Sequence, residues 1–184
     1  MQFENTAIPD VKIVTPKKHG DARGFFSEVY KLSDWQAEDL NLTFIQDNHS
    51  YSAPAGTLRG LHFQIQPVAQ DKLVRVLRGR ILDVAVDIRR SSPTFGRHVA
   101  VELSAANWRQ LLVPVGFAHG FVTLDPDTEV FYKVTGLYSP THDRGLAWDD
   151  PDLGIDWQLP TAVPLLSERD RRWPRLRDLT DMFA

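Results

Sequence analysis

The chain has 184 residues, of which 42% are hydrophobic and 24% are charged, and its formal net charge is −3. This composition is that of one globular domain with a sizeable core, and it gives no indication of nucleic-acid or membrane-surface binding. The chain has no cysteine, which excludes disulfides, thiolate catalysis and cysteine-based zinc sites and fits a reducing cytoplasm. No signal peptide and no transmembrane run are expected.

One short helix is expected early in the chain. Ser33 and Gln36 have the spacing of a capping box, and Trp35 and Leu40 are placed to face the core. The segments that follow carry the patterns of strands and turns rather than those of helices.

Strands dominate the middle of the chain. Residues 73–77 and 82–89 are two expected strands, joined by a tight turn over residues 78–80. In the second strand apolar residues alternate with residues such as Asp83 and Asp87, which predicts one buried face. Further strands are expected over residues 98–103, 110–113, 119–123 and 129–135. Strands at this spacing, without helices between them, predict an antiparallel sandwich or barrel.

The domain organisation expected from the sequence is simple. No linker or internal repeat divides the chain, so we expect one domain over residues 1–184. Its core barrel covers about residues 45–140, and about residues 141–184, rich in Asp, Arg, Trp and Pro, form a cap of loops and a short helix.

Two segments resemble the metal-binding motifs of cupins. Residues 59–64 resemble the first motif, with His62 in place but Gln64 where the second ligand belongs, and residues 114–121, which include His119, resemble the second. Residues 65–70 contain no carboxylate that could replace the missing ligand. Two imidazoles alone make a weak metal site, so we predict organic acid–base chemistry without a metal.

His62 is the first candidate for that chemistry, although a lone strand histidine is often structural. Gln64 and Lys72 add polar groups near the same strand pair. Arg59, three residues before His62, is expected on the opposite face of the strand or in the adjoining turn. Polar groups inside a barrel are costly unless they are paired or used, which favours a functional role.

Tyr132 and Asp170 are further candidates, each with a structural alternative. Tyr132 lies in an expected strand, where it either packs in the core or donates a proton if it faces His62. Asp170 lies in the charged run 167–172, whose composition favours a solvated surface. A buried carboxylate there could instead orient His62 and raise its basicity.

Eight segments, in order along the chain, resemble the dTDP-4-dehydrorhamnose 3,5-epimerase family. They are residues 20–26, 46–50, 58–64, 70–75, 83–89, 91–96, 114–121 and 148–151. The resemblance spans nearly the whole chain. It implies a mainly β fold, a cupin-type antiparallel jelly-roll barrel with a few short helices, notably at the C-terminus. It also implies a homodimer that needs no metal and no cofactor, whereas the absence of cysteine is what favours a cytoplasmic location.

The resemblance implies a reaction as well. The family epimerises C3 and C5 of dTDP-4-dehydro-6-deoxy-D-glucose, which gives dTDP-4-dehydro-β-L-rhamnose for dTDP-L-rhamnose biosynthesis. His62 would be the general base and Asp170 its orienting partner. Lys72 would stabilise the enolate, and Tyr132 would return a proton on the opposite face.

The resemblance also implies the substrate contacts. By position these are Arg23, Glu28, Gln46, Asp47, Asn48, Arg59, His119, Asp143 and Arg169. The segment with Arg23 and Glu28 would reach into the neighbouring site of the dimer. Asp143 and Arg169 stand where the family often has glutamate and lysine; the charge is kept, but arginine and lysine differ in geometry.

Three alternatives remain open from the sequence. The first is a single-centre epimerase that acts at C3 or C5 in another dTDP-4-keto-6-deoxysugar pathway. The second is a metal-dependent cupin such as a dioxygenase, and the third is a non-catalytic cupin that binds sugar nucleotides. No nucleic-acid or membrane partner is expected in any of them.

Overall fold

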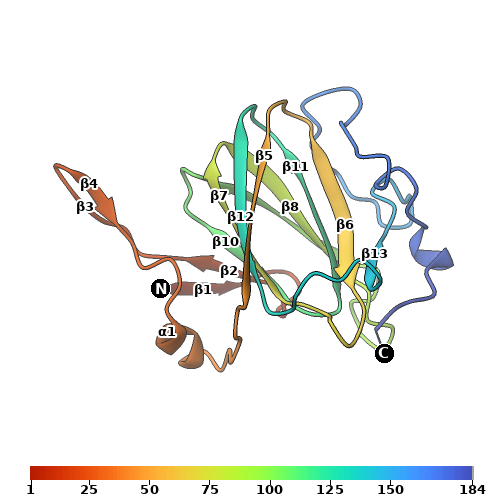
Figure 1. Cartoon of the computed structure of the whole chain (residues 1–184), viewed down its shortest axis with the longest axis horizontal. Helices are drawn as coiled ribbons and strands as arrows, with labels where there is room; N and C mark the ends of the chain where they lie inside the picture. The colour runs from red at the N-terminus through yellow and green to blue at the C-terminus, as the bar shows by residue number, and fades with distance from the viewer. Residues whose placement is uncertain (184) are drawn as a thin grey trace.

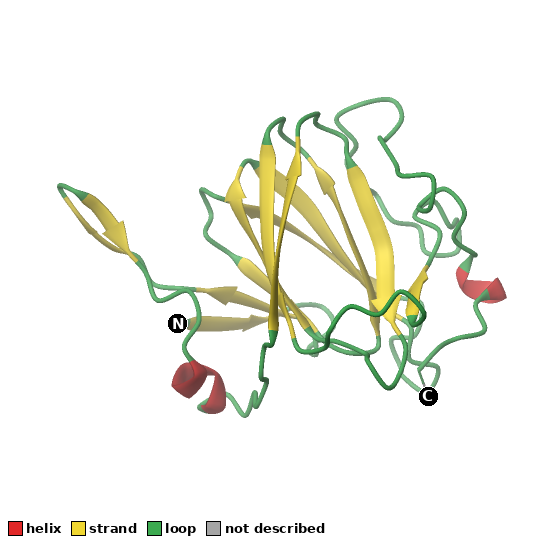
Figure 2. Cartoon of the chain, viewed as in Figure 1, coloured by secondary structure: helices red, strands yellow, loops and turns green. Residues whose placement is uncertain are grey.

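Two antiparallel β-sheets form the body of the protein in the computed structural model, which describes residues 1–183 (Figures 1 and 2). The six-stranded sheet has the order β1-β2-β10-β7-β12-β5, and the five-stranded sheet has the order β13-β6-β11-β8-β9. The strands of the first are β1 (Gln2–Asn5), β2 (Lys12–Thr15), β10 (Gln110–Val113), β7 (Lys72–Arg78), β12 (Thr128–Val134) and β5 (Gln46–Ser52). Those of the second are β13 (Asp143–Gly145), β6 (Leu58–Gln64), β11 (Phe117–Thr123), β8 (Arg80–Asp87) and β9 (His98–Ser104).

The predicted fold class is confirmed. Antiparallel strands dominate, and the helices are short: α1 (Leu32–Gln36) and the 3₁₀ turn η1 (Leu176–Asp178) near the C-terminus. The strands expected in the middle of the chain are all present, within two residues of their predicted bounds. No helix within residues 1–183 is long and apolar enough to cross a membrane.

Three apolar layers hold the sheets together. One cluster lies between the sheets and joins side chains such as Val74 of β7, Ala85 of β8 and Phe121 of β11. A second covers the outer face of the five-stranded sheet. The third packs α1 against the outer face of the six-stranded sheet through Trp35 and Leu73. Burying one large apolar side chain stabilises the fold by about 1.5–3 kcal/mol, so each layer contributes substantially.

The expectation of one buried face for β8 is wrong. Leu82 and Val84 belong to the cluster on the outer face of the sheet, whereas Ala85 belongs to the cluster between the sheets. Both faces of the strand are therefore covered. As a result Asp83 and Asp87, which the alternation placed on a solvated face, are fully buried.

The turn between β7 and β8 is as predicted and depends on Gly79. This residue has a φ of +77°, and a Cβ built on it would lie 2.3 Å from the hydroxyl of Thr128. Any L side chain would meet both the unfavourable backbone conformation and the strand beside it.

The capping box predicted at Ser33 is wrong. Helix α1 follows Lys31 and has no side-chain cap, so Ser33 lies inside the helix. The position of the helix is set by packing instead, since the fully buried Trp35 makes edge-to-face contacts with Phe3 and Phe44. Leu40 packs against the same cluster, as expected.

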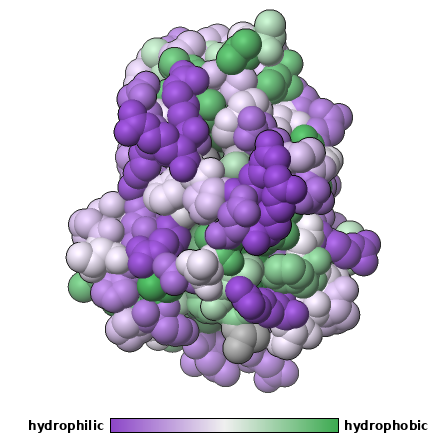
Figure 3. Space-filling view, turned by 90° about the vertical axis from the view of Figure 1, so that its right-hand side faces the viewer, coloured by the Kyte–Doolittle hydropathy of each residue, from purple (hydrophilic) through white to green (hydrophobic). Residues whose placement is uncertain are grey.

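The C-terminal segment covers the outer face of the five-stranded sheet (Figure 1). Trp157, Leu176 and Leu179 are buried in the cluster that this segment shares with the sheet. The outside of this region carries interspersed hydrophilic and hydrophobic residues (Figure 3). The segment is thus bound to the barrel by apolar contacts, and it fixes the position of the residues it carries.

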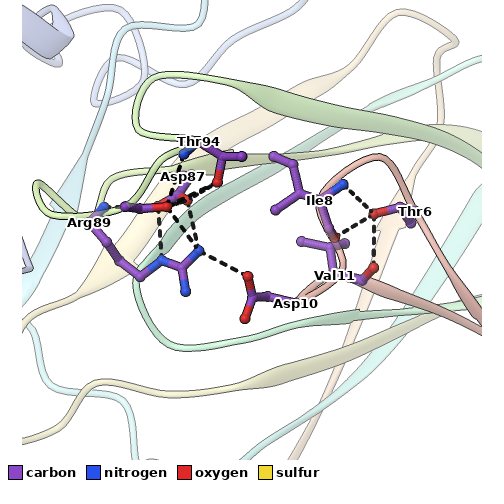
Figure 4. Close-up of polar contacts among 8 residues, drawn as sticks. Thr6, Ile8, Asp10, Val11, Asp87, Arg89 and Thr94 are labelled. Atoms are coloured by element: carbon purple, nitrogen blue, oxygen red, sulfur yellow. Dashed lines mark hydrogen bonds and ion pairs between the residues drawn. The ribbon is translucent and has the colours of Figure 1, made fainter.

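A polar network closes one end of β8. The carboxylate of Asp87 accepts hydrogen bonds from Arg89 at 2.7 Å and 3.0 Å and from the hydroxyls of Ser92 and Thr94, both at 2.6 Å. Arg89 also pairs with Asp10 of the N-terminal loop at 3.1 Å (Figure 4). Burial raises the pKa of Asp87, but these hydrogen bonds outweigh it and lower the pKa to about 2.

A hairpin made of β3 (His19–Asp21) and β4 (Gly24–Phe26) projects away from both sheets (Figure 1). Phe25 and Phe26 are 56% and 67% exposed. Two large apolar side chains on a projecting hairpin are unusual for a surface that meets only water.

Candidate active site

The largest concentration of the predicted residues lies in a cavity between the two sheets. It has two adjoining lobes, which we name after one residue of each. The His119 lobe, of about 470 Å³, is lined by Ser50, Arg59, His62, Lys72, His119, Phe121, Tyr132, Ser167, Arg169 and Asp170. The Tyr138 lobe, of about 270 Å³, is lined by Gln46, Asn48, His62, Phe63, Gln64, Gln70, Lys72, Tyr132, Tyr138, Asp143 and Arg169. Four residues, His62, Lys72, Tyr132 and Arg169, line both lobes.

His62 and Asp170 form a buried pair. Nε2 of His62 lies 2.6 Å from Oδ1 of Asp170, although 108 residues separate them in sequence. Asp170 is 4% exposed, so its reading as part of a solvated charged run is wrong. The C-terminal segment packs on the outer face of the five-stranded sheet, and this packing brings the carboxylate to β6.

The pair has a defined proton arrangement. Burial raises the pKa of Asp170, but hydrogen bonds from His62, Ser167 and Trp173 outweigh it and leave the pKa below its ordinary value. An ionised Asp170 accepts the hydrogen of Nε2, which leaves Nδ1 of His62 as the free base. The geometry is therefore that of an oriented general base.

His119 forms a second buried pair, with Asp83, which the sequence reasoning missed. The two side chains lie 2.7 Å apart. Burial lowers the pKa of His119, and the nearby charge of Asp83 opposes this only in part. The other carboxylate oxygen, Oδ2 of Asp83, has no hydrogen-bond partner within residues 1–183. The alternation of β8 includes Asp83 but predicts a solvated face for it, whereas the residue is fully buried.

Lys72 lies beside the first pair. Its Nζ donates to the main-chain oxygen of His62 at 3.2 Å. Burial lowers the pKa of Lys72 to about 8, and the charges of Asp143 and Asp83 oppose this shift. The ammonium group is therefore a buried cation next to the base, and it is protonated for the most part at neutral pH.

Arg59 lines the His119 lobe, contrary to the expectation that it lies on the opposite face from His62 or in a turn. The pairing of β6 with β11 shifts register between His119, which faces His62, and Phe121, which faces Arg59. The extra residue in β6 is a bulge at Gly60, where φ is +135°. The bulge turns Arg59 toward the same cavity as His62.

Tyr132 lies on β12 and lines both lobes with His62. Burial raises the pKa of its hydroxyl, so the group is a protonated donor at neutral pH. Within residues 1–183 the hydroxyl has no hydrogen-bond partner, which leaves it available to a ligand.

The Tyr138 lobe gathers the predicted nucleotide contacts of β5 and β13. Nε2 of Gln46 donates to Asn48 at 2.8 Å, and Arg169 donates to Asp143 at 2.5 Å. Arg169 and Asp143 thus pair with each other. Together they place a guanidinium fork, suited to phosphate oxygens, at the boundary of the two lobes.

Three predicted residues lie outside both lobes. Asp47 is on the other face of β5 from Gln46 and Asn48 and pairs with Lys133 at 2.7 Å. Arg23 is on the projecting hairpin and pairs with Asp21, and Glu28 lies just beyond it, 3.7 Å from Lys31. The other ten predicted residues are brought together.

Several lining residues were not predicted. Ser50 continues the period of two from Gln46 and Asn48 along β5, and Phe121 follows His119 by two residues on β11, so both could have been found by extending the strand pattern. Tyr138 and Ser167 lie in loops, where no period applies. Within residues 1–183, no group of three or more His, Asp or Glu side chains is placed to hold a metal ion.

Comparison with known proteins places this geometry in a family. The family model described as dTDP-4-dehydrorhamnose 3,5-epimerase matches residues 5–178. The chain belongs to the dTDP-4-dehydrorhamnose 3,5-epimerase family. The epimerase of Sinorhizobium fredii is 51% identical over 183 residues, which cover 100% of this chain and 93% of that protein.

Solved epimerase structures superpose over nearly the whole chain. The enzyme of Bacillus anthracis with TDP and PPi bound gives a TM-score of 0.91 at 50% identity, covering 95% of this chain and 98% of the other. The dTDP-6-deoxy-D-glucose-3,5-epimerase of Legionella pneumophila, in complex with dTDP-4-keto-L-rhamnose, gives 0.92 at 44% identity, covering 97% and 94%.

Proposed function

We propose that this protein epimerises C3 and C5 of dTDP-4-dehydro-6-deoxy-D-glucose to give dTDP-4-dehydro-β-L-rhamnose, in dTDP-L-rhamnose biosynthesis. The observation that carries the proposal is the buried His62–Asp170 pair, which shares one cavity with Lys72 and Tyr132. Membership of the epimerase family supports it. So does the dTDP-4-keto-L-rhamnose bound to the related enzyme of Legionella pneumophila.

Proton abstraction falls to His62. The hydrogens at C3 and C5 flank the C4 ketone, so loss of either as a proton gives an enolate. Nδ1 of His62 takes this proton, and the carboxylate of Asp170 stabilises the imidazolium through Nε2. A positioned base of this kind contributes about a hundred- to ten-thousand-fold in rate.

Lys72 stabilises the enolate. As the C–H bond breaks, negative charge moves to the C4 oxygen, and a fixed cation in a buried cavity stabilises that charge most when solvent is excluded. The ammonium group is in place before the reaction, since it is held against the main chain of His62. The ketone itself is the electron sink.

Tyr132 returns the proton. Its hydroxyl donates to the carbon from the face opposite His62, which inverts the centre and leaves a tyrosinate. The imidazolium then releases its proton to solvent and the tyrosinate regains one, so the protein is restored after each centre. The same acid and base serve C3 and C5 in turn.

The remaining cavity residues hold the nucleotide. Arg59 and Arg169 supply donors for the diphosphate, and His119 lines the same lobe with Nδ1 as an acceptor, since its Nε2 pairs with Asp83. Gln46, Asn48 and Asp143 line the Tyr138 lobe for the nucleoside. Asp47 contributes through its main chain, since its carboxylate pairs with Lys133.

The assembly that we propose is a homodimer. Arg23 and Glu28 lie outside their own cavity, on or beside a hairpin that projects from the body with two exposed phenylalanines. Reaching into a second copy would bring both residues to the neighbouring site and cover this apolar surface. The protein would form one domain over residues 1–184, with a cap from about residue 141 that supplies Arg169 and Asp170. It would act in the cytoplasm.

Solvent exchange tests the proposed reaction. The protein is incubated with dTDP-4-dehydro-6-deoxy-D-glucose in D₂O, and deuterium at each ring carbon is followed by NMR. Label at both C3 and C5 is expected. Label at one carbon indicates a single-centre epimerase, and bound dTDP without any exchange indicates a non-catalytic binder. Loss of turnover on chelation, restored by metal, indicates a metal-dependent cupin.

A further inference from the structure

Gln64, which occupies the position of a cupin metal ligand, is committed to the main chain instead. Its side chain is 4% exposed. Nε2 donates to the carbonyl oxygens of Val68 at 2.8 Å and Leu137 at 3.0 Å, and Oε1 accepts from the main-chain N–H of Ser139 at 2.6 Å. Both hydrogens of the amide nitrogen are therefore used, and neither is free for a ligand.

The two distant partners of Gln64 bracket a single residue, Tyr138. Leu137 precedes it and Ser139 follows it, so one buried amide holds the peptide groups on both sides of the tyrosine. Tyr138 itself is 54% exposed at the rim of the cavity. Its hydroxyl donates to Asp143 at 3.3 Å, and its N–H donates to Gln46 at 3.3 Å.

The rest of this loop is anchored on either side of Tyr138. Before the tyrosine, Nε2 of Gln70 donates to the carbonyl of Gly136 at 2.8 Å. After it, the main chain of Ile65 donates to the carbonyl of His142 at 3.1 Å. Between these anchors, Gln64 holds the tip, residues 137–139, against the barrel. Loss of its amide would free the tip while leaving both ends attached.

We infer that Gln64 is a positioning residue that fixes Tyr138 and thereby sets the affinity of the site for the nucleotide part of a dTDP-sugar. The inference rests on the proposed function, which assigns the Tyr138 lobe to the nucleotide. Gln64 acts through the loop and not on the reacting carbons, because its amide is used by the main chain. Its effect therefore falls on binding rather than on proton transfer.

Gln64→Met tests the inference, because methionine fills a similar volume and lacks all three hydrogen bonds. The probe is dTDP, titrated calorimetrically, with steady-state kinetics alongside. We expect the Kd for dTDP and the KM to rise about tenfold, and kcat to stay within about threefold. Gln64→Glu is a second variant, which keeps an acceptor for Ser139 but sets a carboxylate against two carbonyl oxygens. It should weaken dTDP binding at least as much.

Thr6→Val is the matched control. The hydroxyl of Thr6 holds the loop of residues 6–11 together: its one hydrogen is shared between the carbonyls of Ile8 at 2.7 Å and Val11 at 2.9 Å, and its oxygen accepts from the N–H of Ile8 at 3.2 Å (Figure 4). None of these residues lines either lobe. Its replacement by an isosteric apolar residue should lower the Tm and leave the Kd for dTDP unchanged, which separates loss of stability from loss of positioning.

A double-mutant cycle decides whether Gln64 acts through Tyr138. If it does, adding Gln64→Met to Tyr138→Ala leaves the Kd of Tyr138→Ala unchanged. Additive losses overturn the inference, as does a Gln64→Met protein that binds dTDP like the wild type or loses kcat at unchanged Kd. If the wild type binds dTDP but shows no turnover, the proposed function is wrong. The inference on Gln64 is then still tested by the dTDP titrations.

Discussion

His62 and His119 face each other as register partners on the antiparallel strands β6 and β11, and each is hydrogen-bonded through Nε2 to a buried carboxylate. Both histidines lie in segments that resemble the metal-binding motifs of cupins. Here each imidazole is committed to its own aspartate, His62 to Asp170 and His119 to Asp83. The two pairs differ in surroundings: His62 is partly exposed to the cavity, whereas His119 is buried and its pKa is lowered by that burial. This difference fits His62 to proton transfer and His119 to neutral hydrogen bonding.

Asp170→Asn should remove most of the turnover and little of the binding. An amide keeps the shape of the side chain, but it cannot stabilise the imidazolium of His62 or select the same tautomer. We expect kcat to fall by about a hundred- to ten-thousand-fold, with the Kd for dTDP within about threefold of wild type.

The matched control for this variant is Asp178→Asn, which changes an exposed carboxylate of the same C-terminal segment. It should leave kcat and the Kd unchanged. An Asp170→Asn protein with wild-type kcat would show that the pair does not orient the base.

The strand positions were predictable because they depend on local pattern. The strand over residues 110–113 and the turn at Gly79 follow from alternation and turn residues that lie within a few positions of each other. The roles in the site came from the resemblance to a family. Local pattern alone predicts that Asp170 belongs to a solvated charged run. The carboxylate becomes buried only when the C-terminal segment packs on the five-stranded sheet and meets His62, which is 108 residues away in sequence.

The predictions for Asp83 and Arg59 are wrong for the same reason, since both rest on the pattern of a single strand. Alternation predicts a solvated face for Asp83 because it allows for one covered face, while β8 is covered on both. Strict alternation predicts that Arg59 lies away from His62 because it does not include the bulge at Gly60. Layers and bulges depend on contacts between distant segments, which single-strand patterns do not report.

The pH dependence of activity should be limited on the alkaline side by Lys72. Burial lowers the pKa of its ammonium group to about 8, so the cation that stabilises the enolate is lost as the pH rises through that value. We expect kcat/KM to fall above about pH 8 in a pH–rate profile. An activity that stays constant to pH 10 would contradict the role of this ammonium group.

The effect of Lys72 on the free energy of unfolding should have the opposite pH dependence to its effect on activity. The folded pKa lies below the unfolded value, 10.5, so the unfolded chain binds more protons between about pH 8 and 10.5. The contribution of this group to stability therefore rises with pH across that window, by on the order of 3 kcal/mol. Lys72→Met should be more stable than wild type at pH 7, and the difference in urea unfolding should shrink by pH 10.

Gly60→Ala should be strongly destabilising. A Cβ at this position would lie 2.5 Å from Cα of Gly120, and the φ of +135° is one that L side chains rarely adopt. Strain and overpacking together should cost about 3–5 kcal/mol in urea unfolding. Any folded protein that remains should bind dTDP more weakly, because the bulge directs Arg59 into the cavity.

Gly24→Ala separates the cost of backbone strain from the cost of overpacking. Gly24 has a similar φ, +133°, but a Cβ there meets nothing within 4 Å. Its replacement should cost about 1–2 kcal/mol, the strain alone. Equal losses in the two variants would show that contact with Gly120 contributes nothing.

Asp87 should govern stability in acid. Its folded pKa, about 2, is below the value of 3.8 for a free aspartate. Its contribution is therefore fully present above pH 4 and is lost as the pH falls toward 2. Asp87→Asn should lower the Tm by several degrees at pH 7, because it replaces a charged acceptor of Arg89 and two hydroxyls with a neutral amide. The gap between the variant and the wild type should narrow at pH 2.

Asp10→Asn is the control variant for the loss of stability in Asp87→Asn. Asp10 pairs with the same guanidinium group, but its side chain is 52% exposed. Exposed ion pairs contribute about 0–1 kcal/mol, so this variant should change the Tm at pH 7 far less than Asp87→Asn does. If the two variants lose equal stability, the exposed pair of Arg89 with Asp10 stabilises the fold as much as the buried carboxylate of Asp87 does, which contradicts the prediction. If the loss in Asp87→Asn is the same at pH 2 and pH 7, the carboxylate does not titrate as its buried hydrogen bonds require.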